Sequence, residues 1–205
     1  MAKEQLDNNT ENRIKNAARA VFYRKGFAAT KTRDIAEEAG INVALLNYYF
    51  RSKEKLFNII MLETLLAFFQ SMAAVVRDEE TTLEEKIERM VDRYIDVLVN
   101  EPTIPVFIMS ELRNNPDELL AQLNIRQMMS GAALFRQLED YMRENNRKPV
   151  PPVYFIINLL GLVAFPFIAS PIVRHMGNLS QEQFNHMMIE RKQLIPVWIK
   201  AILNS

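Results

Sequence analysis

The chain has 205 residues with 25 Lys+Arg, 25 Asp+Glu and no cysteine, so its formal net charge is zero. Without cysteine, disulfide bonds, thiol nucleophiles and thiolate metal sites are excluded. The five glycines are too far apart for a phosphate-binding loop, and neither H-E-x-x-H nor G-x-S-x-G occurs. We therefore expect no catalytic residues, no metal and no cofactor.

The charges are unevenly distributed along the chain. Residues 1–55 contain eleven Lys/Arg and seven Asp/Glu, a net of +4, whereas the rest contains fourteen and eighteen, a net of −4. A basic segment on an acidic body is a first, weak indication that the N-terminal part contacts nucleic acid.

Helical periodicity dominates the sequence, which predicts an all-α fold of about nine helices. The first helix is expected over residues 11–25, capped by Thr10 and ended by Gly26. A second is expected over residues 31–39 with Thr30 as its cap, and a third runs from Asn42, another cap, through Tyr49. Two short helices joined by a tight turn at Gly40 form a helix-turn-helix unit.

The remaining helices are expected to be longer and more apolar. Ser52 caps a helix over residues 53–77 that is apolar nearly all round and must be buried on several sides. Capping boxes at Thr82 and Ser180 open the fifth and ninth helices. A sixth ends near residue 113, a seventh follows the Asn115 cap to about residue 145, and an eighth lies within residues 149–173. Pro166 and Pro196 are expected to kink the eighth and the ninth helix, respectively.

An ordered set of residues from the first to the fourth helix resembles the TetR family (TetR/AcrR type) of bacterial transcriptional regulators. The matching residues are Ile14, Ala17, Ala18, Val21, Phe22, Gly26, Phe27, Thr30, Arg33, Asp34, Ile35, Ala36, Ala39, Gly40, Ile41, Asn42, Leu46, Tyr49, Phe50, Ser52, Lys53 and Leu56. The rest of the chain resembles the family only in its helix layout. The resemblance implies a DNA-binding domain over residues 1–52 and a ligand-binding and dimerisation domain over residues 53–205.

The resemblance also implies which residues contact DNA. Arg33 is expected to reach a guanine or the backbone, and Lys31 and Thr32 to contact phosphates. Asn42, Val43 and Ala44 begin the recognition helix, in which Tyr48 faces the groove and Tyr49 contacts a phosphate, as does Lys53 at the start of the fourth helix. The alternatives are solvated Arg33 and Lys53 side chains, and tyrosine rings packed on the core, although two consecutive rings cannot both point inward.

The recognition helix departs from the family pattern at three positions. Val43, Leu45 and Asn47 stand where the family commonly has Lys or Gln, Thr or Ser, and Tyr, respectively. Val43 and Ala44 can contact thymine methyl groups, and Asn47 can read adenine or hold a phosphate. These departures affect which bases are read rather than the class of protein.

The uncharged stretch over residues 149–173 is long enough to span a bilayer. Pro166, Pro171 and Asn158 argue against a membrane span, and the amphipathic ninth helix needs a partner. In the family the last two helices form a four-helix dimer interface. We therefore expect a homodimer and no membrane partner. The expected interface residues are Leu159, Leu162, Phe165, Met187, Ile195 and Trp198.

Methionine and phenylalanine residues of helices four to eight suggest a large apolar effector cavity. The candidate lining residues are Phe68, Met72, Tyr94, Phe107, Met128, Phe135, Phe155 and Asn158, with Tyr94 and Asn158 as polar anchors. Each can instead simply pack the core. His186 and Glu190 lie one turn apart, where a solvated pair is favoured over a metal site.

Taken with the resemblance, these features predict a cytoplasmic repressor that binds a palindromic operator as a homodimer. Half-site centres are then about 34–36 Å apart. A small, largely apolar effector would enter the cavity, shift the fourth helix and release the DNA. The alternative is an apolar-ligand carrier or membrane-anchored protein without sequence-specific DNA binding, which explains the apolar C-terminal half but not the pattern from Thr30 to Lys53.

Overall fold

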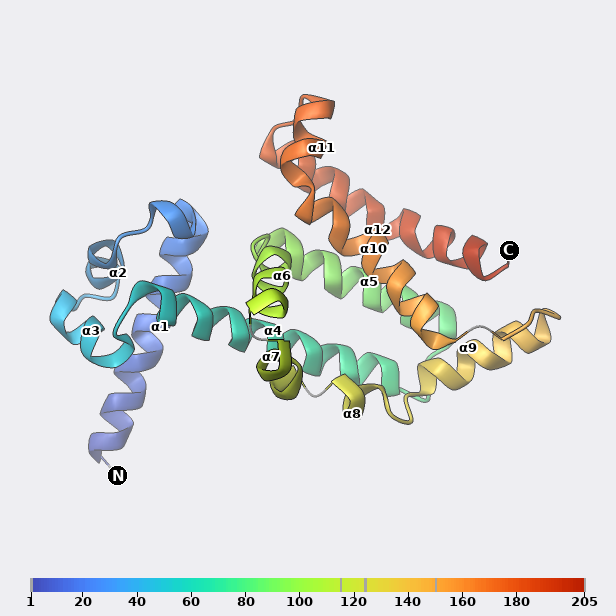
Figure 1. Cartoon of the computed structure of the whole chain (residues 1–205), viewed down its shortest axis with the longest axis horizontal. Coiled ribbons are helices and arrows are strands. Elements are labelled where there is room, and N and C mark those ends of the chain that lie inside the picture. The colour runs from blue at the N-terminus through green and yellow to red at the C-terminus, as the bar shows by residue number, and fades with distance from the viewer. Residues whose placement is uncertain (1, 115, 124, 150, 205) are drawn as a thin grey trace. The chain divides into compact units, whose positions relative to one another are not determined.

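The computed structural model describes the backbone of residues 2–114, 116–123, 125–149 and 151–204, and their side chains except those of residues 2–8, 23, 118, 126 and 128. Within these ranges the chain forms twelve α-helices and no strand (Figure 1), which confirms the all-α prediction. Contacts divide it into two compact units, Met1–Leu65 and Leu66–Ser205. The division falls inside one helix, so the domain boundary at residues 52/53 stays a proposal.

The first unit contains α1 (Ala2–Ala29), α2 (Thr32–Glu38), α3 (Val43–Phe50) and the beginning of α4 (Lys53–Arg77). Its core consists of the apolar faces of these four helices. The side chains with no exposed surface are Ile14, Ala18, Val21, Ile35, Leu46, Leu56 and Ile60. Burying a Leu or Ile side chain stabilises a fold by about 1.5–3 kcal/mol, so these side chains contribute to holding α2 and α3 in place.

Two of the expected caps in this unit are wrong. Helix α1 begins at Ala2, so Thr10 lies inside it, and Gly26 with φ 73° and ψ 161° interrupts it before a last turn to Ala29. Thr30 is buried and donates its hydroxyl to the Gly26 carbonyl at 2.7 Å. The N-cap of α2 is Lys31, whose N–H donates to the Asp34 carboxylate at 2.9 Å. Thr30 therefore closes the turn after α1 and does not cap α2.

The caps of the next two helices are confirmed. The Asn42 side chain accepts the Leu45 N–H at 2.8 Å, and the Ser52 hydroxyl accepts the Lys55 N–H at 3.1 Å. Gly40 takes φ 62° in the turn between α2 and α3, a conformation that glycine adopts at little cost. The helix-turn-helix thus has the geometry that its turn residues predict.

The second unit contains the rest of α4 and eight further helices. Helix α5 is central because α9, α10 and α12 all pack against it. The eight helices are α5 (Leu83–Asn100), α6 (Ile104–Asn114), α7 (Pro116–Leu123), α8 (Ile125–Met129), α9 (Ala133–Glu144), α10 (Pro152–Ile168), α11 (Ser170–Gly177) and α12 (Gln181–Leu203). The strong amphipathic pattern of α5 buries Ile87, Val91 and Ile95, while its charged face stays in solvent.

The chain has twelve described helices where about nine were expected because two expected helices are broken. The expected seventh is divided into α7, α8 and α9, with Gly131 at φ 66° before α9, and its Asn115 cap lies outside the described residues. The expected eighth is divided into α10 and α11, which are bent by 69°. This bend follows Ala169 rather than Pro166. Helix α12 continues through Pro196.

An arginine on α12 compensates for the proline inside α10. Pro166 has no N–H to donate to the carbonyl four residues before it, that of Leu162. The Arg191 guanidinium donates to that carbonyl at 2.6 Å. A carbonyl orphaned by proline therefore finds its donor on a neighbouring helix, and α10 stays helical past the proline.

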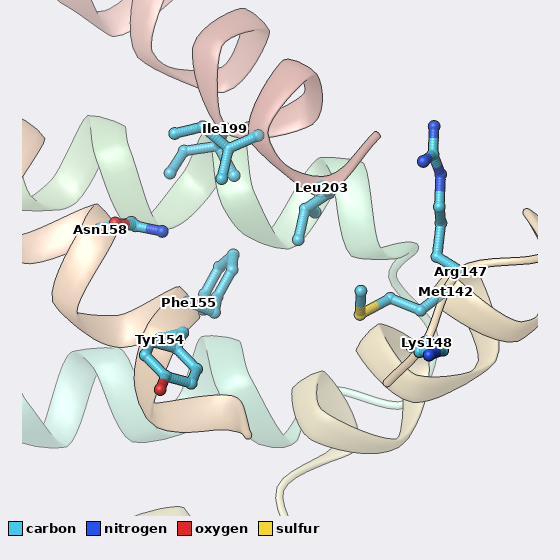
Figure 2. A pocket seen from close by; sticks show the side chains of 9 residues that line it. Met142, Arg147, Lys148, Tyr154, Phe155, Asn158, Ile199 and Leu203 are labelled. Atoms are coloured by element: carbon cyan, nitrogen blue, oxygen red, sulfur yellow. The ribbon is translucent and has the colours of Figure 1, made fainter. Parts of the chain in front are cut away.

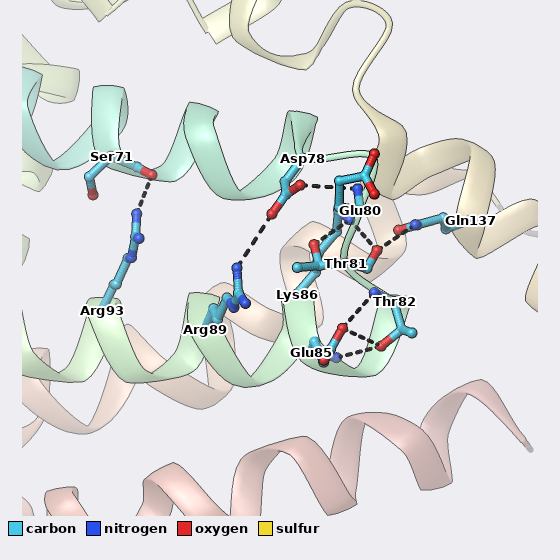
Figure 3. A network of polar contacts seen from close by, with 10 residues as sticks. All are labelled: Ser71, Asp78, Glu80, Thr81, Thr82, Glu85, Lys86, Arg89, Arg93 and Gln137. Carbon is cyan, nitrogen blue, oxygen red and sulfur yellow. Dashed lines mark hydrogen bonds and ion pairs between the residues drawn. The ribbon is translucent and has the colours of Figure 1, made fainter.

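The turn between α4 and α5 is held by a network of polar contacts (Figure 3). The capping box of Thr82 and Glu85 is present as predicted. The ammonium of Lys86 is fully buried and donates to the Thr81 carbonyl and hydroxyl at 2.7 and 2.8 Å. Gln137 of α9 donates to the same carbonyl at 2.7 Å. Thr81 thus joins α5 to α9.

Candidate nucleic-acid interface and ligand cavity

Helix α3 has one buried and one exposed face. Leu46 and Phe50 point into the core, whereas Ala44 and Asn47 are exposed and Tyr48 has 79% of its surface in solvent. The Tyr48 and Tyr49 rings meet edge to face with centroids 5.4 Å apart. A short helix that shows a polar side chain and an exposed aromatic ring to solvent fits the major groove of DNA.

The start of α2 presents cationic side chains beside this face. Lys31 and Arg33 are exposed and Thr32 is half-buried. Arg33 has no ion pair or hydrogen bond within the part of the chain that the structure describes. Asp34 is occupied: its hydrogen bond from the Lys31 N–H and its ion pair with Lys25 at 3.1 Å hold the pKa of Asp34 below its usual value. Among the described residues, the guanidinium of Arg33 is thus exposed and unpaired.

Lys53 is engaged inside the first unit. Its ammonium donates to the carbonyls of Phe27 and Thr30, both at 2.9 Å, and lies 4.3 Å from the centre of the Phe27 ring. It therefore ties the start of α4 to the turn between α1 and α2, a role that the sequence did not suggest. An ammonium has three N–H donors, and the two carbonyls use two of them. The third can still donate to a phosphate, so the predicted phosphate contact stays a prediction.

Near the turn from α3 to α4, two exposed cations were not predicted as DNA contacts. Arg51 follows α3 with φ 62°, and Lys55 lies in the first turn of α4; both are exposed. By contrast, Lys15 and Arg19 pair with Glu63 of α4 at 2.7 and 3.2 Å. The left-handed conformation of Arg51 is set by the turn into α4, and no sequence signal at an arginine indicates it.

A small apolar cavity of about 150 Å³ lies in the second unit. Its wall brings together three of the predicted effector residues and holds no charged side chain. The lining residues are Phe68, Phe69, Met72, Val76, Met90, Tyr94, Ile125, Met129, Ile156, Leu159 and Leu160. The Tyr94 ring meets Phe68 edge to face at 4.6 Å, and burial raises the pKa of Tyr94 to about 12. This side chain is therefore neutral at physiological pH.

The other predicted effector residues do not line this cavity. Phe107 is buried on α6 and Phe135 is half-buried on α9. Phe155 and Asn158 line a second cavity of about 510 Å³ (Figure 2) because they lie on a different face of α10 from Ile156 and Leu160. The side chain of Met128 is outside the described residues.

The expected dimer interface is narrowed by burial within the chain. Leu159 and Ile195 are 3% and 0% exposed, so these two expected interface residues belong to the core instead. Helical periodicity alone does not say which of several apolar faces points inward. Phe165 is 62% and Trp198 37% exposed, while Leu162 and Met187 are half-buried. Further exposed apolar side chains accompany them on α10, α11 and α12: Ile157, Ile168, Ile172, Met176, Leu194, Val197 and Ile202.

His186 and Glu190 form an exposed pair with 3.4 Å between Nε2 and Oε1. Among the described residues no group of three His, Cys, Asp or Glu side chains gathers around them or elsewhere. By length and composition α4 can span a membrane, and so can α10 and α11 if they are counted together despite their bend. In the structure, α10 packs against α5 and α12 as core helices do.

Comparisons with known proteins agree with this geometry. Residues 14–60 match the family described as bacterial regulatory proteins, tetR family. The chain is 21% identical over 201 residues to the probable HTH-type transcriptional regulator YttP of Bacillus subtilis, which covers 96% of this chain and 95% of that protein. It is 32% identical over 108 residues to the HTH-type transcriptional repressor NicS of Pseudomonas putida, covering 53% of this chain and 50% of NicS.

Solved structures have the same fold. A regulator of the TetR/AcrR family from Thermobifida fusca matches with a TM-score of 0.62 at 18% identity, over 92% of this chain and 97% of that one. The transcriptional regulator FadR from Bacillus subtilis, in complex with stearoyl-CoA, matches with a TM-score of 0.53 at 18% identity, over 89% and 96% of the two chains.

Proposed function

We propose that this chain is a transcriptional regulator of the TetR family, a cytoplasmic repressor that binds a palindromic operator as a homodimer and is released by a small, largely apolar effector. The observation that carries the DNA-binding part is the surface formed by α3 and the start of α2. Arg33 on α2 and Tyr48 on α3 are both exposed there, and the two helices are neighbours in a unit with its own buried core.

In this proposal α3 lies in the major groove. Asn47 and Tyr48 face the bases, Val43 and Ala44 contact thymine methyl groups, and Asn42 begins the helix. Arg33 reaches a guanine or the backbone. Lys31, Thr32, Tyr49 and Lys53 contact phosphates, which position the protein without reading sequence.

The homodimer rests on the exposed apolar side chains of α10, α11 and α12. Phe165 on α10 and Trp198 on α12 are the largest of them. Leu162 on α10 and Met187 on α12 are half-buried and extend the same surface. Patches of this kind mark protein interfaces on soluble proteins. A two-fold axis makes the operator a palindrome whose half-site centres lie about 34–36 Å apart.

The effector site is the 150 Å³ cavity, to which α4 contributes Phe68 and Met72. An apolar cavity of about this size stays dry and takes up molecules as small as benzene. Helix α4 also carries Lys53 in the first unit, so an effector that shifts α4 changes the spacing of the recognition helices. Bound DNA then lowers the affinity for the effector by the same factor by which the effector lowers the affinity for DNA. The solved FadR complex with stearoyl-CoA and the repressor NicS support ligand binding and repression.

Selection of bound DNA from a random pool tests this function. We expect an enriched palindrome with half-sites one helical turn apart, and a complex whose mass corresponds to whole dimers. Enrichment of no sequence above the starting pool, with the protein folded by circular dichroism, would refute sequence-specific repression.

A further inference from the structure

A second, larger cavity lies between the end of α9, the first half of α10 and the end of α12. Its volume is about 510 Å³, within the range of about 300–1,000 Å³ typical of small-molecule sites. The lining residues are Met142, Arg147, Lys148, Tyr154, Phe155, Asn158, Ile199, Ile202 and Leu203. None of them lines the effector cavity described above, so the two cavities share no lining residue.

The body of this cavity is apolar. Met142, Phe155, Ile199 and Leu203 are all buried side chains from three different helices, and they meet around it (Figure 2). Such a wall holds a hydrocarbon chain or ring, with about 25 cal/mol gained for each Å² of apolar surface removed from water. The fully apolar effector cavity shares this property, so the wall alone does not set the ligand class.

One side of the cavity is cationic. Arg147 and Lys148 lie together on the loop after α9, opposite Tyr154 and Asn158 (Figure 2), and no acidic side chain is among the lining residues. Lys148 has no ion pair or hydrogen bond with any described residue. Arg147 donates to the Asn204 carbonyl.

The beginning of α10 adds to this positive potential. Tyr154 and Phe155 belong to its first turn, which starts at Pro152 after a Pro151 that provides no side-chain cap. The N-terminus of a helix carries about half a positive charge, which favours anions placed beside it. Two cationic side chains and a helix N-terminus thus adjoin a pocket whose remaining wall is apolar except for Tyr154 and Asn158.

We propose that this cavity is a second ligand site, which binds an amphiphile with an anionic head group. The head group, a carboxylate or a phosphate, lies between Lys148, Arg147 and the start of α10. The hydrocarbon body lies against Phe155, Ile199 and Leu203, and Asn158 offers a hydrogen bond at the other side. An uncharged ligand fills the same wall but leaves Lys148 without a partner.

Calorimetric titration of the full chain with octanoate, octyl phosphate and octan-1-ol tests the head group. We expect both anions to bind more tightly than the alcohol, and Lys148→Gln to raise the octanoate Kd about three- to tenfold, which is the range for a partly exposed charge-assisted contact. Arg113→Gln, a matched loss of one exposed cation on α6, should leave the Kd unchanged. Equal affinity for octanoate and octanol, or an unchanged Kd in Lys148→Gln, would overturn the proposal. A preference between the two anions identifies the head group.

A pair of tryptophan variants tests whether octanoate binds in this cavity. Ile202 and Ile189 are 42% and 47% exposed on the same helix, but only Ile202 lines the cavity. Ile202→Trp should narrow the cavity and weaken octanoate binding, whereas Ile189→Trp should not, with folding checked by circular dichroism and the oligomeric state of both variants by sedimentation equilibrium. Equal effects of the two would show that octanoate binds elsewhere. No operator is needed, so the outcome is independent of the proposed DNA binding.

Discussion

Arg33 is the residue on which the proposed DNA contact depends most directly. It is exposed, and its five N–H donors have no partner within the described part of the chain. Arg33→Ala should weaken operator binding about 10- to 100-fold, since a bidentate contact with guanine contributes about 1–3 kcal/mol. Gel-shift titration measures this, with Arg113→Ala as the control cation in the second unit.

Tyr49→Ala should also weaken operator binding while the fold and the dimer stay intact. Unchanged affinity in both the Arg33→Ala and the Tyr49→Ala variant would contradict the assigned surface.

Lys53 should matter for the stability of the first unit as well as for DNA. Lys53→Met keeps the aliphatic stem but removes the donor to the Phe27 and Thr30 carbonyls. A charged hydrogen bond contributes about 1.5–3 kcal/mol, and partial exposure places the expected loss in unfolding free energy at the lower end, about 1.5 kcal/mol. Urea denaturation measures this, and Lys55→Met, an exposed lysine on the same helix, should cost much less.

The salt dependence of DNA binding separates the two roles of Lys53. If its ammonium also binds a phosphate, Lys53→Met should reduce the slope of log K against log[salt] by about one for each phosphate that it no longer neutralises. In the urea experiment, an unchanged unfolding free energy in Lys53→Met would show that the hydrogen bonds to the Phe27 and Thr30 carbonyls are not formed in solution.

Within α10, the contact between Arg191 and the Leu162 carbonyl should depend on Pro166. Arg191→Met leaves that carbonyl without a donor, which costs about 1–3 kcal/mol of unfolding free energy, and it also removes the stacking of the guanidinium 5.0 Å from the Trp198 ring. Pro166→Ala restores an N–H that can donate to the same carbonyl. Arg191→Met should therefore cost less in the Pro166→Ala background, and a double-mutant cycle measures the difference. Additive costs would show that the arginine does not compensate for the proline.

Helix N-caps could be predicted from the sequence where the capping side chain and its backbone partner are a few residues apart. The caps at Asn42, Ser52, Thr82 and Ser180 are all present, because each depends only on a donor three residues ahead. Thr30 was misread because the carbonyl of Gly26 competes for its hydroxyl. The break after Ala169 was placed at Pro166 because the compensating Arg191 is far away in the sequence.

The candidate sites were readable only in part for the same reason. Apolar character marks Leu159, Ile195 and Phe165 alike, but packing buries the first two and leaves Phe165 exposed. The effector residues were chosen by chemistry, and the fold distributes those whose side chains it describes over two cavities and other positions in the second unit. Which face of α10 meets which neighbour is decided by contacts between helices distant in the sequence, and periodicity does not contain that information.

The proposed homodimer can be tested at its exposed apolar residues. Phe165→Glu places a charge on a surface that is apolar and exposed in the single chain, so folding should be little affected. In a dimer the same charge is buried without a partner, which is strongly unfavourable. We expect sedimentation equilibrium to show a monomer, and operator affinity to fall with it. Glu182→Gln, an exposed substitution in the first turn of α12, should remain dimeric. A dimeric Phe165→Glu protein would place the interface elsewhere.

The whole chain is neutral, yet its DNA binding should depend steeply on salt. The charges cancel between +4 in residues 1–55 and −4 in the rest, so that each protomer brings a basic segment to the DNA. Contacts with phosphates release condensed counterions, and six to ten of them in a dimer lower the affinity about 10³- to 10⁵-fold between 50 and 200 mM salt. Operator titrations across this range measure the slope, and a glutamate salt in place of chloride separates anion effects. A flat response would mean that the basic segment does not face the phosphates, whatever the sequence preference of the protein.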